Sequence, residues 1–464
     1  MKIELAKTET IHFVGIGGIG MSGLALIMKA MGFKVQGSDI GYNKNIERLK
    51  KNKIKIKIGH NKKNINHATI LVTSSAIKKN NPEIIAAKKN QLPIYKRGEM
   101  LGNIVSLTKN IVVAGSHGKT TTTSLISGIF ATAKLDPTII NGGVLNSFKN
   151  SAKLGKSKWC ILESDESDGS FIKVPPTYAI VTNIDREHMD YYRSMDHLKD
   201  LFIEFIGKVP SFGKTFICID DKNNCEILKK IKIKNFYTYG TNPKSQFQIK
   251  DFKQFKDYSQ FNVIVRLPGK KKISLNNIRI PLLGLHNVRN ATASLAVSIT
   301  IGISSEIIKR SLREFKGVER RFNKIFTFRE TDFYDDYAHH PSEIREVLNG
   351  VRDAYKKEKI ICIFQPHRIS RLKDLRKEFS SSFRKADTVV LCPLYSAGEK
   401  MKLGFSYNTF ANEIIKDSKT NLFLVNNENH LAKFIKQTIR GKEIVVGMGA
   451  GSISNWMKQL PKIL

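Results

Sequence analysis

The chain has 464 residues, of which 41% are hydrophobic, so two to four globular domains are expected and general disorder is excluded. No apolar run is long enough for a membrane span, and the N-terminus lacks a signal-peptide core, which predicts a cytoplasmic protein. The formal net charge is +36, mostly from lysines spread along the chain without a nucleic-acid recognition motif. A compositional bias is therefore favoured over specific nucleic-acid binding.

A complete G-x-G-x-x-G stands near the N-terminus, between a predicted strand and a predicted helix. Residues 11–14 form the strand, residues 15–20 the turn, and the helix runs from about residue 21 to 31. A second strand then leads to Asp39, as in the dinucleotide-binding fingerprint. Gly15 makes the turn, and Gly17 lets the backbone approach a diphosphate at the helix end. NAD and a nucleotide-diphospho sugar both carry that group, so both ligands stay open.

Strand-like and helical segments continue to alternate up to about residue 98. Strands are expected at residues 54–58 and 69–73, with a helix near residues 82–90. This alternation predicts an open parallel sheet.

The pattern G-x-x-G-K-T at residues 115–120 predicts a phosphate-binding loop. Residues 111–114 read as a buried strand, the glycines turn the chain, and Lys119 and Thr120 open a helix. Lys119 would reach the phosphates of a nucleotide, and Thr120 would ligate Mg²⁺. Val113 stands where the general motif has glycine, so the loop is a shorter variant.

Two further strands end in groups that suit a nucleotide enzyme. The strand at residues 159–162 runs into the acidic segment 163–168, where Glu163 is the best candidate for a Mg²⁺ ligand. For the other acids of that segment, a solvated turn is an equal alternative. The strand at residues 179–184 precedes His188, a candidate metal or phosphate ligand at the carboxyl edge of the sheet.

The C-terminal half offers weaker signals. Residues 214–283 are lysine-rich with β-like alternation and show no chemistry. A helix start with His286 and Asn290 could hold a base or ribose, or could be ordinary capping. Residues 326–334 are β-like, and the strand at residues 360–364 ends in a basic turn that could capture a carboxylate or could simply be exposed.

Eight segments together resemble the Mur ligases, the ATP-dependent amide-forming enzymes of peptidoglycan synthesis. They follow the family's order over almost the whole chain, and the shortened phosphate loop fits that family. The segments are GIGGIGMSGLA (15–25), GSHGKTTTT (115–123), ESDESDGSF (163–171), TNIDREHMDYY (182–192), GLHNVRNATA (284–293), GVERRF (317–322), DDYAHHPSE (335–343) and FQPHRISR (364–371).

The resemblance implies an α/β protein of three domains. Residues 1–98 would be a Rossmann-like UDP-sugar domain, residues 99–316 a central P-loop ATPase domain with a parallel sheet, and residues 317–464 a C-terminal Rossmann-like domain with amino-acid and ATP contacts. It also implies UDP-N-acetylmuramate, L-alanine and ATP as substrates, Mg²⁺ as cofactor and an acyl-phosphate intermediate.

The resemblance also implies roles for individual residues. Catalysis would use Lys119, His188, Arg321 and Asp336, and the metals would be held by Thr120, Glu163 and His188. ATP would contact Gly115, Ser116, His117, Gly118, Lys119, Thr120, Thr121, His286, Asn290 and Arg321. The UDP sugar would contact Gly15, Gly17, Gly18, Gly20, Asp39, Ser74 and Arg97. The amino acid would contact Tyr337, His339, His367, Arg368 and Arg371.

Three other functions compete with this hypothesis. Within the family, a ligase that attaches a preformed tripeptide to the same sugar nucleotide is the nearest, although residues 19–22 look more like members that add alanine. An NAD-dependent dehydrogenase is suggested by the first glycine turn and Asp39, but it leaves Lys119 and Thr120 unused. A nucleotide-gated binding module without catalysis leaves the acids around Glu163 unused.

Overall fold

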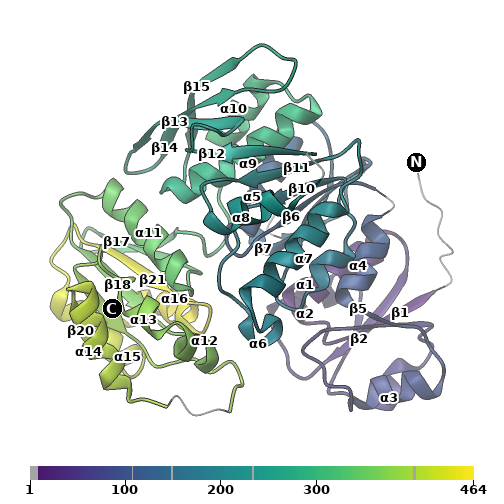
Figure 1. The fold of residues 1–464 in the computed structure, drawn as a ribbon. Helices are drawn as coiled ribbons and strands as arrows, with labels where there is room; N and C mark the ends of the chain where they lie inside the picture. The colour runs from purple at the N-terminus through teal and green to yellow at the C-terminus, as the bar shows by residue number, and fades with distance from the viewer. Residues whose placement is uncertain (1–8, 107, 148–149, 233–234, 401–403) are drawn as a thin grey trace. The chain divides into compact units, whose positions relative to one another are not determined.

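The computed structural model describes residues 9–106, 108–147, 150–232, 235–400 and 404–464. The chain divides into two compact units. Unit 1 consists of Met1–Lys250, Asn262–Ile278 and Arg289–Phe315, and unit 2 of Asp251–Phe261, Arg279–Val288 and Lys316–Leu464. Three sheets with flanking helices make up the fold, which confirms the α/β class (Figure 1). Among the described residues, no helix has the length and apolarity to cross a membrane.

The first sheet is parallel throughout and has the strand order β3-β2-β1-β4-β5. The order reverses beside β1, and in such sheets ligands bind at this point, outside the carboxyl ends of the strands. Its strands are β1 (Thr10–Val14), β2 (Lys34–Asp39), β3 (Lys55–Ile58), β4 (Ile70–Thr73) and β5 (Ile94–Lys96), and its helices are α1 (Ile19–Ala30), α2 (Lys44–Lys51), η1 (Lys62–Ile65), α3 (Pro82–Lys89) and α4 (Arg97–Val105).

The second sheet has ten strands in the order β15-β14-β13-β12-β11-β10-β6-β9-β7-β8. Strand β6 lies between β9 and β10 and is parallel to both, so the carboxyl ends of these three strands meet at one edge. The strands are β6 (Lys109–Ala114), β7 (Thr138–Leu145), β8 (Asn150–Lys153), β9 (Trp159–Glu163), β10 (Tyr178–Val181), β11 (Lys214–Cys218), β12 (Phe236–Gly240), β13 (Phe247–Gln254), β14 (Ser259–Val265) and β15 (Ile273–Ile280).

The helices of this central region follow the sheet strands, and the lysine-rich residues 214–283 supply the strands β11 to β15. The helices are α5 (Lys119–Thr132), η2 (Ser170–Lys173), α6 (Met189–Tyr192), α7 (Met195–Gly207), α8 (Lys222–Lys230), α9 (Leu285–Ile301) and α10 (Ser305–Arg313).

The first two sheets share one apolar core within unit 1. Leu24 and Met28 of α1 belong to the same buried cluster as Val112 of β6, Ile140 of β7 and Ala152 of β8. Helix α1 packs on β7 and β8. The N-terminal sheet is therefore fixed to the phosphate-loop sheet by buried apolar contacts rather than only by a linker.

The third sheet, in unit 2, has the order β16-β17-β21-β18-β19-β20 and is parallel except for the β16–β17 pair. Along β18, Cys362 and Phe364 face the cluster that holds α11 to α14, while Ile361 and Ile363 face α15 and α16. Both faces are thus covered (Figure 1). The elements are β16 (Asn323–Phe328), β17 (Thr331–Asp336), α11 (Pro341–Ala354), β18 (Ile360–Phe364), α12 (Ile369–Asp374), α13 (Arg376–Ser380), β19 (Thr388–Leu391), α14 (Tyr407–Ser418), β20 (Asn421–Leu424), α15 (Glu428–Thr438), β21 (Ile444–Met448) and α16 (Ile453–Ile463).

The strands expected from the sequence are present within a few residues. The residues 326–334, expected to be β-like, form parts of the antiparallel hairpin β16–β17. The hairpin reverses at Arg329 and Glu330, which both have left-handed backbone angles, with φ of 47° and 58°.

Candidate active site

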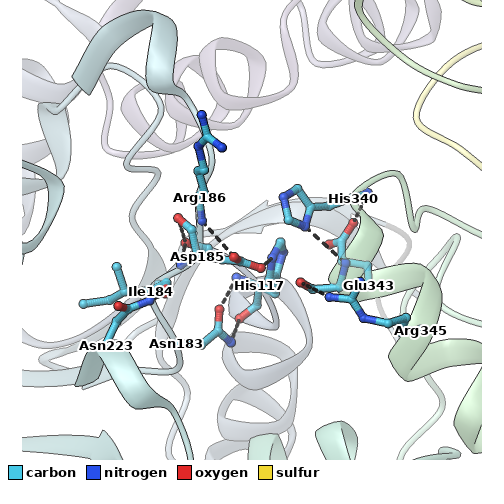
Figure 2. Close-up of polar contacts among 12 residues, drawn as sticks. His117, Asn183, Ile184, Asp185, Arg186, Asn223, His340, Glu343 and Arg345 are labelled. Atoms are coloured by element: carbon cyan, nitrogen blue, oxygen red, sulfur yellow. Dashed lines mark hydrogen bonds and ion pairs between the residues drawn. The ribbon is translucent and has the colours of Figure 1, made fainter. Parts of the chain in front are cut away.

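The loop between β6 and α5 is held in shape by the segment that follows β10. The His117 amide donates to Asn183 Oδ1 at 2.9 Å, and the Ser116 amide donates to the Asn183 carbonyl at 2.9 Å. His117 Nε2 lies 3.0 Å from Asp185 Oδ2. Figure 2 shows His117 between the side chains of Asn183 and Asp185. The loop is therefore preorganised by its neighbour strand.

Two glycines of this loop adopt conformations that other residues rarely tolerate. Gly115 has a φ of 126°, and a Cβ there would lie 2.1 Å from Thr182 Oγ1. Gly118 has a φ of 82°, and its Cβ would lie 2.5 Å from Asn290 Oδ1. Thr120 and Thr121 follow, buried in the first turn of α5. Strand, turn and helix N-terminus thus form the arrangement that binds phosphate.

Lys119 points back over its own loop. Its Nζ donates to the carbonyls of Gly115 at 2.6 Å and Ser116 at 3.1 Å, and to Glu166 Oε2 at 2.7 Å. Burial lowers the pKa of Lys119, but the charges of Glu166, Asp165 and Glu163 outweigh it and raise the pKa above its usual value. The lysine is therefore a charged group at the mouth of the loop.

Three side chains at this edge form a group that could hold a metal ion. One ligand atom from each of Asp165, Glu166 and His188 lies within 4.8 Å of the others. Glu166 Oε1 is buried and has no hydrogen-bond partner among the described residues, so it can accept a further bond. His188 caps α6 with a left-handed φ of 56°, a strained geometry that is typical of functional positions.

The predicted metal ligands are only partly brought together. Glu163, at the end of β9, accepts a hydrogen bond from the Gly142 amide at 2.8 Å. Thr120 lies on the phosphate loop, while His188 gathers with Asp165 and Glu166. In the sequence, Asp165 and Glu166 are marked only by the acidic run at residues 163–168. Their place beside His188 in the fold distinguishes them from acids of a solvated turn.

The glycine turn after β1 is held by hydrogen bonds to the end of β2. The amides of Gly15 and Ile16 donate to the Ser38 carbonyl at 2.9 Å and 3.0 Å. The Gly17 amide donates to Asp39 Oδ2 at 2.8 Å. Asp39 thus holds the turn itself in this structure. Of the other predicted residues, the Gly18 amide lies 3.4 Å from the Gly15 carbonyl, and the Ser74 amide donates to the Val14 carbonyl at 3.2 Å.

Arg97 lies beside the first glycine turn, and its charge also acts on Asp165. Its side chain lies against the glycine turn, because a Cβ on Gly20 would be 3.3 Å from Arg97 Nη1. Burial raises the pKa of Asp165, but Lys119, the Ser167 amide, His188 and Arg97 together hold it below its usual value. Arg97 therefore contributes to the electrostatics of Asp165 as well as contacting the first turn.

Asp336 and Arg321 lie in unit 2, at the end of β17 and in the turn before β16. Asp336 Oδ2 accepts from the Phe322 amide and Oδ1 from the Ala338 amide, both at 2.8 Å. Burial raises the pKa of Asp336 to about 6, against the opposing charge of Arg321. The carboxylate thus ties the turn to the strand end.

Aromatic and basic groups gather beside Asp336. The guanidinium carbon of Arg320 lies 4.7 Å from the centroid of the Tyr337 ring, and that of Arg321 lies 5.5 Å from it. His339 Nδ1 is 2.9 Å from the Tyr337 carbonyl and 3.3 Å from Glu343 Oε2.

The predicted carboxylate-binding turn follows β18. His367 stacks on Tyr395 at 5.5 Å between ring centroids, and its Nδ1 lies 3.3 Å from Arg371 Nη1. Burial, His339 and the nearby arginines lower the pKa of His367 to about 3, so the ring is neutral. Arg368 has a left-handed φ of 71°. Glu399 accepts from the amide and hydroxyl of Ser370 at 3.0 Å and 2.7 Å.

Two of these residues, Tyr395 and Glu399, were missed by sequence reasoning. They lie 24 or more residues beyond the basic turn, and no local motif links them to it. Of the two nucleotide candidates near α9, Asn290 lies against Gly118, whereas His286 lies 3.6 Å from Glu346 in unit 2.

Three family models match successive parts of the chain. They are described as Mur ligase family, catalytic domain (residues 10–109), Mur ligase middle domain (residues 113–298) and Mur ligase, glutamate ligase domain (residues 320–451). The chain is similar to the UDP-N-acetylmuramate–L-alanine ligase of Pelagibacter ubique, with 74% identity over 464 residues that cover both chains completely. The ligase of the same name from Bartonella bacilliformis is 40% identical, covering 100% of this chain and 98% of that protein.

Solved structures of Mur ligases have a similar fold. A UDP-N-acetylmuramate–alanine ligase from Thermotoga maritima superposes with a TM-score of 0.81 and 26% identity, over 98% of each chain. A murein peptide ligase from Psychrobacter arcticus has the same fold, with a TM-score of 0.72 at 23% identity over 98% of each chain. The chain belongs to the Mur ligase family, as its motifs predicted.

Proposed function

We propose that the protein joins L-alanine to the lactyl carboxylate of UDP-N-acetylmuramate in a reaction driven by ATP. The observation that carries the proposal is the 74% identity, over the full length of both chains, with a ligase of that name. The phosphate loop and the nearby acids and histidine supply the groups that such chemistry needs. Membership of the Mur ligase family argues against the dehydrogenase hypothesis. A noncatalytic binding module would not need the group formed by Asp165, Glu166 and His188.

The chemical problem is that a carboxylate has no good leaving group. Transfer of the γ-phosphoryl group to a carboxylate oxygen releases ADP and gives an acyl phosphate. The amine nitrogen of alanine then attacks the carbonyl carbon and forms the C–N bond. The bond between that carbon and the phosphate oxygen breaks, inorganic phosphate leaves with the bonding electrons, and the nitrogen loses a proton to give the amide. Lys119 would offset repulsion between the carboxylate and the triphosphate, because its charge is preorganised at the phosphate loop.

The group formed by Asp165, Glu166 and His188 suits a divalent cation such as Mg²⁺. Asp165 and Glu166 offer carboxylate oxygens and His188 adds a nitrogen, and within the described part of the chain Glu166 Oε1 is a buried acceptor with no hydrogen-bond donor. Thr120 and Glu163 remain further candidate ligands. When bound, Mg²⁺ would neutralise phosphate charge during transfer.

We assign each substrate to one sheet edge, and the groups that lie there support the assignment. The sugar nucleotide would bind at the glycine turn with Arg97, and ATP at residues 115–121. The amino-acid carboxylate would bind at Arg368 and Arg371, beside His367. We further propose domain limits of 1–98, 99–316 and 317–464, and a cytoplasmic location.

A substrate panel tests the proposal. The protein is incubated with ATP, Mg²⁺ and UDP-N-acetylmuramate together with alanine, serine, glycine or the murein tripeptide, and phosphate and new amide are measured. Alanine should give both products in equal amounts, and omission of any substrate should give neither. Amide formation with the tripeptide but not with alanine would favour the tripeptide ligase instead.

A further inference from the structure

A buried carboxylate lies behind the first glycine turn and has no part in the proposed chemistry. Glu83, in the first turn of α3, has a relative exposure of 0%. Its Oε2 accepts from Ser38 Oγ at 2.6 Å and lies 3.2 Å from His12 Nε2. Its Oε1 accepts from Asn64 Nδ2 at 2.6 Å and from the Asn61 amide at 3.2 Å.

The donors around Glu83 fix the direction of each hydrogen bond. Ser38 has one hydroxyl proton and gives it to Glu83, so His60 Nδ1, 3.0 Å from Ser38 Oγ, must donate to that oxygen. His12 Nε2 donates to the carboxylate. Burial raises the pKa of Glu83, but the hydrogen bonds from His12, Ser38 and Asn64 outweigh it and lower the pKa to about 2. Glu83 is therefore an ionised hub.

The hub acts on the glycine turn through one residue. Ser38 gives its hydroxyl proton to Glu83, and its carbonyl accepts the amides of both Gly15 and Ile16. The next residue, Asp39, accepts the amide of Gly17 at 2.8 Å. Rotation or displacement of Ser38 would thus move three consecutive amides at the N-terminal end of α1.

We propose that Glu83 is a positioning residue for the sugar-nucleotide site, holding Ser38 and Asp39 so that the glycine turn fits a diphosphate. The inference rests on the proposed function, because it takes the turn to be the site of the UDP group. Glu83 itself touches no substrate.

The test compares Glu83→Gln with the wild type in steady-state kinetics and in calorimetric binding of UDP-N-acetylmuramate. Glutamine keeps the shape but offers one acceptor oxygen in place of two. The Kd and KM for the sugar nucleotide should rise about tenfold or more, because a displaced turn loses its fit. The KM values for ATP and alanine, and kcat, should stay within about twofold.

Two further variants separate positioning from general destabilisation. Ile84→Val removes a methyl group from the neighbouring core residue of α3, outside the polar network, and should leave the Kd for the sugar nucleotide unchanged. Ser38→Ala should reproduce the effect of Glu83→Gln, and the double variant should be no worse than either, since both break the same link.

An unchanged Kd in Glu83→Gln would overturn the inference, as would an equal loss in Ile84→Val. Additive effects of Ser38→Ala and Glu83→Gln would also overturn it. The binding measurement needs no turnover. If the wild type binds the sugar nucleotide but forms no amide, the proposed function fails while the positioning role is still decided.

Discussion

Lys119 is the residue whose role can be tested most simply. It is charged and lies over the phosphate loop, where it contacts Gly115, Ser116 and Glu166. Lys119→Ala should lower kcat by about a thousandfold, because a preorganised charge is lost from the developing phosphoryl group. Binding of UDP-N-acetylmuramate, measured by calorimetry, should persist. Lys153→Ala, which removes a half-exposed partner of Asp136, serves as the control and should turn over normally.

Normal turnover by Lys119→Ala would contradict the assignment of residues 115–120 as the ATP site. Loss of sugar-nucleotide binding in that variant would show that the two loops do not bind their ligands independently.

Asp336 gives a prediction about pH. Its pKa is about 6 in the folded protein against 3.8 for an ordinary aspartate, because it is buried. Between these pH values the folded state keeps a proton that the unfolded chain releases, so wild-type stability falls as the pH rises through the window. Above pH 6 the free energy of unfolding of the wild type is lower by at most about 3 kcal/mol than at acidic pH. Asp336→Asn lacks this titration.

Chemical denaturation at several pH values between 4.5 and 7 measures the effect. The free energy of unfolding of Asp336→Asn, relative to wild type, should rise with pH over this range. The same difference at every pH would show that the carboxyl group titrates alike in both states.

At the scale of elements, the phosphate loop depends on backbone geometry that only glycine supplies. Gly118→Ala would add a Cβ 2.5 Å from Asn290 Oδ1 at a φ of 82°. The KM for ATP should rise about tenfold or more, because the loop amides lose their convergence on the phosphate. Gly128→Ala is the matched control within α5, since its Cβ would meet only Ser311 Oγ at 3.4 Å. It should bind ATP normally and gain about 0.5 kcal/mol in stability. Equal KM values for the two variants would contradict the role of Gly118.

Most elements could be predicted because their signals are local. The last four residues before the phosphate loop, 111–114, are apolar and buried, and β18 was predicted with its exact bounds. The β16–β17 hairpin was missed because its turn residues, Arg329 and Glu330, both adopt positive φ without the Asn-Gly signal that usually marks such a turn.

The candidate site was less accessible to sequence reasoning. Lys119 and His188 lie within motifs, so their position at the sheet edge followed from the strand pattern. The pairing of Lys119 with Glu166, the approach of Arg97 to Gly20 and the hydrogen bond of Ser38 to Glu83 join residues 45 or more positions apart. Such contacts depend on tertiary packing, which periodicity does not encode.

At the scale of the molecule, the net charge of +36 has a consequence of its own. The protein should bind DNA without sequence preference. The binding should weaken steeply with added salt, because the release of cations from the DNA then contributes less free energy. Fluorescence anisotropy with two unrelated duplexes measures this. A strong preference for one duplex at high salt would contradict a merely compositional origin of the charge.

The first two sheets share one core, and the glycine turn and the phosphate loop both lie in unit 1. This supports the central claim that ATP cleavage is coupled directly to activation of the sugar-nucleotide carboxylate. The most direct measurement uses UDP-N-acetylmuramate labelled with ¹⁸O in its lactyl carboxylate, together with ATP and L-alanine. Mass spectrometry of the released phosphate should find one labelled oxygen per phosphate, transferred from the carboxylate through the acyl phosphate. Phosphate released without label while amide accumulates would contradict the account.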